Sequence, residues 1–110
     1  MDLGFTSATQ GSWAVVEAAG ELDISNSSEL GELVLAQIGE GAARVAVDLS
    51  RVSFMDSSTL GVLVGCLKRA REHGGELVLI GVVGSPRRVM EITGLDKAFL
   101  LVPTPADLPS

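Results

Sequence analysis

Apolar residues alternate along this 110-residue chain between the spacing of strands and the spacing of helices. The clearest helical stripe has four apolar residues spaced i, i+3, i+4 and i+7: Leu60, Leu63, Val64 and Leu67. Apolar runs at residues 44–49 and 77–82, typical of buried strands, lie on either side of it. Strands that alternate with helices predict a largely parallel sheet joined by right-handed crossovers.

A hairpin and a first helix are expected before this region. Strand-favouring residues at 12–19 follow a turn-rich stretch, so we expect them to pair with an edge strand near residues 3–8. Asn26 stands three residues before Glu29, which is the spacing of a helix cap, and apolar residues then recur at helical intervals. A first helix is therefore predicted to begin next to Asn26.

A short helix and a last strand are expected near the carboxyl end. Ser85 followed by Pro86 indicates an N-cap and a first helical residue, and Gly94 would end that helix. A last strand is predicted near residues 99–102. The prolines of residues 103–110 oppose regular structure, so we expect a loose tail.

Together these elements predict one α/β domain over residues 1–102, followed by the proline-containing tail at 103–110. The expected architecture is a mixed, largely parallel β-sheet with an N-terminal hairpin and three or more packing helices. A chain of 110 residues, 46% of them hydrophobic, suits one domain with one packed core.

The chain is acidic, with 14 Asp and Glu residues against 8 Lys and Arg residues. The resulting net charge of −6 disfavours binding to nucleic acid or to an anionic membrane, so a protein partner or small ligand is expected. The apolar runs are far shorter than the ~18 residues that indicate a membrane span. The start of the chain also lacks a signal-peptide pattern, so a cytoplasmic protein is expected.

Residues suited to catalysis or metal binding are scarce. Cys66 and His73 are the single cysteine and histidine, too few for a disulfide or a structural zinc site. The glycines of residues 81–84 lack the spacing and the Lys-Ser/Thr of a nucleotide loop. The sequence has no Gly-x-Ser-x-Gly elbow, and His73 is expected at a polar helix end, so a Ser-His-Asp triad has no evident base. We therefore expect no enzyme activity, no cofactor and no metal.

Four consecutive polar residues precede the strongest helix: Asp56, Ser57, Ser58 and Thr59. One N-cap residue, worth about 0.5–2 kcal/mol, would suffice to begin this helix. The additional hydroxyls lie where free amides and the positive end of the helix dipole would stabilise a phosphate. A cap and a phosphorylation site fit this run equally well.

Three motifs in order extend this pattern along the chain: Gly20-Glu21-Leu22-Asp23, Val47-Asp48-Leu49-Ser50, and Phe54-Met55-Asp56-Ser57-Ser58-Thr59-Leu60-Gly61-Val62-Leu63. Together they resemble the STAS domain family, and in particular the single-domain anti-sigma factor antagonists of bacteria. The resemblance continues to Gly94-Leu95. It implies a STAS-like mixed sheet packed with helices, and a regulatory role without catalysis.

The resemblance also implies a phosphorylation cycle. In that family the unphosphorylated antagonist binds an anti-sigma factor that is also a serine kinase, which frees a sigma factor for transcription. The kinase phosphorylates the hydroxyl directly after the motif aspartate, and a metal-dependent phosphatase removes the phosphate. By position Ser57 is the phosphoacceptor, with Ser58 as second choice. Thr59 stands where the family often has glycine, which keeps a third hydroxyl under consideration.

A partner that packs over this helix start would contact six residues: Asp23, Asp56, Ser57, Ser58, Thr59 and Leu60. A phosphate adds a charge of about −1.5 to −2, and like charges facing each other at an interface cost several kcal/mol. Asp23 is expected at a strand end on the same rim of the sheet as Asp56. There it either adds to the negative charge or serves as a turn residue. Leu60 either packs in the core or contacts the partner.

The free protein is expected to be a monomer. The alternative function is a STAS module that acts as a scaffold or nucleotide sensor in a larger signalling assembly.

Overall fold

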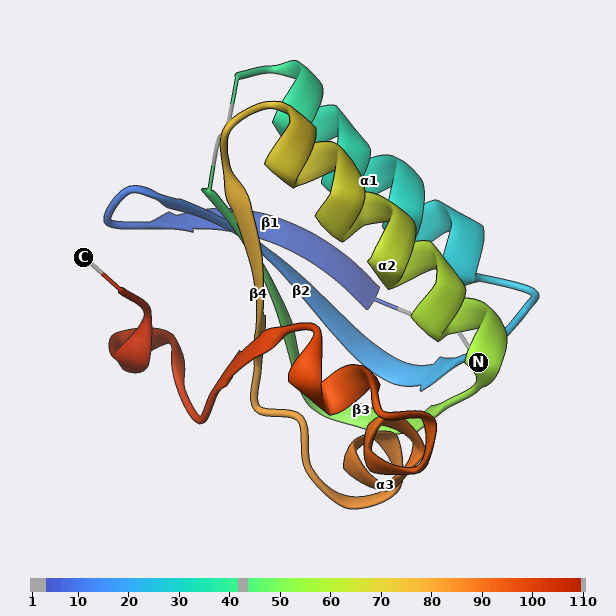
Figure 1. Cartoon of the computed structure of the whole chain (residues 1–110). Coiled ribbons are helices and arrows are strands. Elements are labelled where there is room, and N and C mark those ends of the chain that lie inside the picture. The colour runs from blue at the N-terminus through green and yellow to red at the C-terminus, as the bar shows by residue number, and fades with distance from the viewer. Residues whose placement is uncertain (1–3, 42–43, 110) are drawn as a thin grey trace.

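The computed structural model describes residues 4–41 and 44–109, in which a five-stranded sheet is packed with helices (Figure 1). The strands are β1 (Gly4–Gln10), β2 (Trp13–Leu22), β3 (Arg44–Met55), β4 (Glu76–Ile80) and β5 (Leu100–Val102). The helices are α1 (Ser27–Gly39), α2 (Ser57–Glu72) and α3 (Gly84–Thr93), with 3-10 turns at Leu95–Lys97 and Pro105–Asp107.

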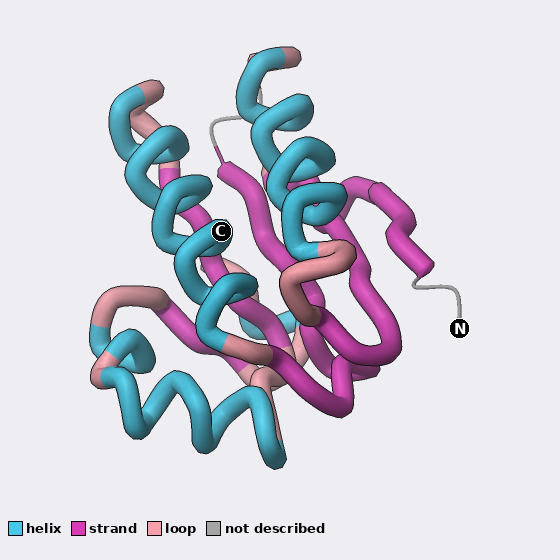
Figure 2. The backbone as a smooth tube through the Cα atoms, turned by 90° about the vertical axis from the view of Figure 1, so that its right-hand side faces the viewer, coloured by secondary structure: helices cyan, strands magenta, loops and turns pink. Residues whose placement is uncertain are grey.

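The strands lie in the order β1-β2-β3-β4-β5. β1 pairs with β2 in an antiparallel hairpin, and every later neighbour is parallel. Helices α1 and α2 stand side by side over one face, while α3 lies across the end of the sheet and packs against β3 (Figure 2). The predicted mixed, largely parallel sheet with an N-terminal hairpin and three helices is confirmed.

Both faces of the sheet are apolar. Successive side chains of a strand point to opposite faces, so the consecutive apolar residues of these strands supply both. Val16, Val47 and Leu79 face α1 and α2 and belong to the larger core. A smaller cluster lies on the opposite face: Trp13, Val15, Ala46, Val78, Ile80 and Val102. Burial on both faces explains why residues 44–49 form a continuous apolar run.

Strands β2 and β3 are longer than the sequence predicted. Residues 51–55 of β3 extend beyond the end of β4 and pair only with β2. In this part Val52 and Met55 are buried, whereas Arg51, Ser53 and Phe54 are exposed, so the segment looks polar in the sequence. Register shifts near Glu17 and Gly20 similarly interrupt the apolar alternation of β2.

Two of the predicted helix caps are wrong in detail. Asn26 occupies the N-cap position of α1, but its side chain donates to the carbonyl of Glu21 and accepts from the amide of Asp23. It therefore stabilises the preceding loop instead of the helix. Helix α3 begins at Gly84, so Ser85 already lies inside its first turn and makes no capping bond. Gly94, with φ +77°, ends α3 as predicted.

The expectation of a loose tail is also wrong for residues 103–109. Thr104 and Asp107 bond each other reciprocally and close a 3-10 turn. The carbonyl of Pro109 then accepts a hydrogen bond from the Trp13 indole. Residue 3 of the predicted edge strand and residue 110 of the tail lie outside the described residues. No helix within 4–41 and 44–109 is long and apolar enough to span a membrane.

The contact between α1 and α2 gives a first prediction. A Cβ added at buried Gly31 would lie 2.7 Å from Cγ1 of Val62, a stiff β-branched side chain. We expect Gly31→Ala to lower the free energy of unfolding by about 1–3 kcal/mol through overpacking. Gly65→Ala is the matched control, because nothing lies within 4 Å of its added Cβ. It should raise stability by about 0.5–1 kcal/mol through helix propensity.

Urea unfolding of both variants measures the difference. Equal stability changes for Gly31→Ala and Gly65→Ala would contradict a close helix contact at Gly31.

Candidate functional site

The candidate site lies where β2 and β3 end side by side. Leu22 is paired with Met55, and the amide of Asp56 donates to the carbonyl of Leu22 at 3.2 Å. Asp23 and Asp56 are therefore the first residues after the neighbouring ends of β2 and β3. Their predicted placement on one rim, the edge of the sheet where these strands end, is confirmed. The carboxyl ends of parallel strands are also where open α/β sheets bind their ligands.

Asp56 is the only residue between β3 and α2, and it caps the helix. Its Oδ1 atom accepts hydrogen bonds from the Ser58 hydroxyl at 2.6 Å and from the Thr59 amide at 3.1 Å. The bond from the Ser58 hydroxyl is the main cause that lowers the pKa of Asp56, and the bonds from Thr59 act in the same direction. Burial opposes them. The predicted cap role of this run belongs to Asp56, which stays ionised at neutral pH.

The three hydroxyl residues after Asp56 have different environments. Thr59 is fully buried, and its hydroxyl lies 3.3 Å from Oδ1 of Asp56. Ser58 is half-buried and donates to the same oxygen. Ser57 is exposed, and its hydroxyl makes no hydrogen bond to any residue within 4–41 and 44–109. The rim therefore presents one accessible and uncommitted hydroxyl.

A partner can contact only side chains that are exposed on the rim, and Thr59 and Leu60 are not. They are 0% and 2% exposed, because they occupy the first inward-facing positions of α2. The expectation that these two residues touch a partner is therefore corrected. Core packing, the other possibility for Leu60, is confirmed.

The β2–α1 loop forms the other half of the rim. Asp23 accepts hydrogen bonds from the amide and the hydroxyl of Ser25, so it serves as a turn residue. Its half-buried carboxylate nevertheless stands at the strand end next to Asp56. Both roles considered for Asp23, turn residue and rim charge, are thus compatible.

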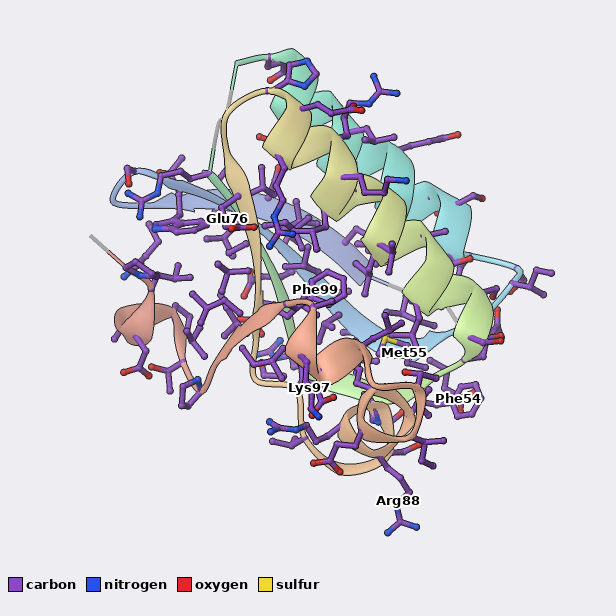
Figure 3. All side chains as sticks on the ribbon, viewed as in Figure 1. Phe54, Met55, Glu76, Arg88, Lys97 and Phe99 are labelled. Carbon is purple, nitrogen blue, oxygen red and sulfur yellow. The ribbon has the colours of Figure 1, made fainter. Side chains whose placement is uncertain are left out.

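Two exposed apolar residues next to the aspartates were missed by the sequence analysis. Ile24 is 80% exposed and Phe54 is 42% exposed. Figure 3 shows Phe54 pointing outward at the end of β3, whereas Met55 points inward beneath the helices. The two-residue period of a strand could not have identified Phe54, because a register shift between Val52 and Phe54 places the buried residues Val52 and Met55 three positions apart. Ile24 has no sequence signal either, because it lies in a loop.

The remaining chemically interesting residues have structural roles. Burial raises the pKa of the Cys66 thiol to about 11, which keeps it protonated and unreactive. His73 is exposed at the carboxyl end of α2, as predicted. A Cβ on Gly81 would come within 2.6 Å of Ser50, so this glycine allows close chain packing after β4. The part of the chain that the structure describes contains no cluster of His, Cys, Asp and Glu suited to a metal.

Comparisons with known proteins agree with this architecture. The family model described as STAS domain matches residues 5–108. An anti-sigma-B factor antagonist of Staphylococcus aureus is 38% identical over 95 residues, which are 86% of this chain and 88% of that protein.

Two solved structures have similar folds. The crystal structure of an anti-sigma factor antagonist from Mycobacterium paratuberculosis matches with a TM-score of 0.86 at 26% identity, covering 96% of this chain and 90% of that one. The Bacillus cell fate determinant SpoIIAA in its phosphorylated form matches with a TM-score of 0.69 at 24% identity, covering 89% and 90%. The latter likeness concerns the fold alone.

The cap gives a second prediction. Asp56→Ala should lower the free energy of unfolding by about 0.5–2 kcal/mol at neutral pH, whereas Asp56→Asn should cost less because asparagine also caps helices. The lowered pKa means that the contribution of the carboxylate is complete above the ordinary value of 3.8 and is lost as the pH falls through the folded-state value.

Urea unfolding at a series of pH values above and below 3.8 tests this dependence. The stability gap between the wild type and Asp56→Asn should close toward low pH. A gap that does not change with pH would show that the ionised carboxylate is not what stabilises the helix start.

Proposed function

Because this chain belongs to the STAS domain family, we propose that it is an anti-sigma factor antagonist controlled by phosphorylation of Ser57. In this proposal the unphosphorylated protein binds an anti-sigma factor that is also a serine kinase, and thereby releases a sigma factor. Phosphorylation of Ser57 by that kinase ends the complex, and a phosphatase restores it. The protein itself is regulatory and not catalytic, and it acts as a cytoplasmic monomer when free.

The observation that carries the proposal is the accessibility of Ser57. A kinase must reach the hydroxyl that it phosphorylates, and Ser57 is exposed while Ser58 is bonded to Asp56 and Thr59 is buried. The cap is already provided by Asp56, so Ser57 is not needed to begin α2. The names of the relatives support the antagonist role, and the phosphorylated form of SpoIIAA supports a phosphorylation cycle on this fold.

Charge explains how a phosphate would act as a switch. At the first residue of α2 the positive end of the helix dipole favours a phosphate, so the fold itself tolerates the modification. The added charge joins Asp23 and Asp56 on one rim. At an interface such a concentration of like charge costs several kcal/mol, and each ~1.4 kcal/mol lowers affinity tenfold.

The surface around Ser57 also suits a protein partner. Ile24 and Phe54 are exposed apolar side chains that flank the two aspartates, and they would be removed from water by a partner. We therefore include Ile24 and Phe54 in the proposed contact surface, with Asp23, Asp56, Ser57 and Ser58. Thr59 and Leu60 support this surface from below.

Substitutions at Ser57 test the function. Ser57→Ala should bind the kinase as the wild type does but take up no phosphate, because the accepting hydroxyl is gone. Ser57→Asp should weaken binding at least tenfold, which corresponds to about 1.4 kcal/mol of charge repulsion. Ser58→Ala is the matched control and should still be phosphorylated. Binding is measured by titration calorimetry, and phosphate by intact-protein mass after incubation with the kinase and ATP.

Two results would overturn this assignment. One is full phosphorylation of Ser57→Ala. The other is a loss of folding stability in Ser57→Ala well above the ~2 kcal/mol upper range of a lost cap, which would make Ser57 a structural residue.

A further inference from the structure

The sheet face opposite α1 and α2 is covered by the chain's own carboxyl-terminal segment. Residues 103–109 leave β5 and run along this face, on the far side of the sheet from the two long helices (Figure 1). Leu108 packs against the apolar cluster that includes Trp13, Val15 and Ile80. Among the apolar side chains described in residues 103–109, Leu108 is the one that packs on this cluster.

A polar contact fixes the end of the segment. The carbonyl oxygen of Pro109 accepts from Nε1 of Trp13 at 2.7 Å and from Nη2 of Arg44 at 3.0 Å. The guanidinium of Arg44 lies 4.4 Å from the centre of the Trp13 ring and also donates to the hydroxyl of Ser12. Cation–π attraction and the bond to Ser12 therefore help to hold both donors toward the Pro109 carbonyl.

The chemistry of this contact is that of peptide recognition. Aromatic grooves bind proline-containing peptides because these peptides are already extended and present free carbonyls. Leu108 has φ −62° and ψ 138°, close to the polyproline II conformation, and Pro109 follows it. An indole N–H and a guanidinium that share one backbone carbonyl, next to an apolar position for Leu108, form a small version of such a groove.

The segment is held by few contacts. Its side chains from 103 to 109 are exposed or half-buried, and a cavity of about 200 Å³ remains between residues 10–13 and 105–109. A second cavity of about 260 Å³ lies on another side of Trp13, lined in part by Gln37 and Glu40. A segment with little buried apolar contact opens locally at a lower free energy than the core.

We propose that Trp13 and Arg44 form a recognition site for an extended, proline-containing peptide, and that residues 103–109 occupy it as an intramolecular ligand. The segment leaves and rebinds while the sheet and helices stay folded. Trp13 begins β2, whereas Asp23 follows its last residue. The ten residues of β2 place the two sites about 30 Å apart, so this proposal does not rest on the function proposed for Ser57.

Tryptophan fluorescence tests the proposal in the full chain, because Trp13 is the single tryptophan. Leu108→Asp places a charge on the apolar cluster and should release the segment, so quenching of Trp13 by acrylamide should rise several-fold. Ile92→Asp makes the same aliphatic-to-aspartate change at a 78% exposed position of α3, outside the segment and the Trp13 cavities, and should leave quenching unchanged. Amide hydrogen exchange in α1 and α2 should be the same in both variants and in the wild type.

Rebinding is tested with the peptide Pro-Thr-Pro-Ala-Asp-Leu-Pro, blocked at both ends. Added at millimolar concentration to the Leu108→Asp protein, it should lower quenching back toward the wild-type value in a saturable way, since a tethered segment acts at about millimolar effective concentration. The same peptide with Asp in place of Leu should have no effect.

Three results would overturn the proposal. Unchanged quenching in Leu108→Asp would mean that the segment does not cover Trp13. Loss of exchange protection in α1 and α2 would mean that the segment is part of the cooperative core. Failure of the peptide to restore protection would mean that the site does not recognise this segment as a ligand.

Discussion

The parallel pairing of β2 with β3 is the interaction on which the rest of the structure depends. It aligns Leu22 with Met55, so both strands end at the same edge of the sheet and the residues that follow, Asp23 and Asp56, become neighbours. The bond from the Asp56 amide to the Leu22 carbonyl fixes this edge up to the start of α2. An acidic rim thus arises from two segments separated by more than thirty residues of sequence.

The short connection between β3 and α2 then decides what each polar residue can do. Since Asp56 alone joins the two elements, the helix begins immediately and its phase assigns the next positions. Thr59 and Leu60 turn inward, Ser58 bonds the cap, and Ser57 remains exposed. Helix cap and candidate phosphorylation site are therefore parts of one arrangement, in which the aspartate stabilises the helix and leaves one hydroxyl free.

The sequence predicted the parts of the molecule that depend on local patterns. The stripe of α2 and its N-terminal cap region were correct because helical spacing and cap chemistry act over a few residues. The alternation of strands and helices was also sufficient to predict a mixed, largely parallel sheet with an N-terminal hairpin, although not the order of the strands in it. The same patterns placed Asp23 and Asp56 on one rim, since the ends of parallel strands lie at one edge.

Features that depend on distant neighbours were not predictable in the same way. The end of β3 pairs on one side only and therefore lacks a buried-strand signature. The role of Asn26 depends on near neighbours, but on the folded shape of the β2–α1 loop, which brings the carbonyl of Glu21 within reach of its side chain. The tail is ordered through Trp13, more than ninety residues away, and no pattern within 103–110 encodes that partner.

The most direct measurement is peptide mass mapping of the protein isolated from its own cells. The tryptic fragment of residues 52–68 contains the three hydroxyl residues that follow Asp56, namely Ser57, Ser58 and Thr59, so one fragment reports on all three. We expect a population of this fragment with a single phosphoryl group on Ser57. A phosphoryl group on Ser58 or Thr59, or a well-observed fragment that is unmodified under every growth condition, would contradict Ser57 as the phosphoacceptor.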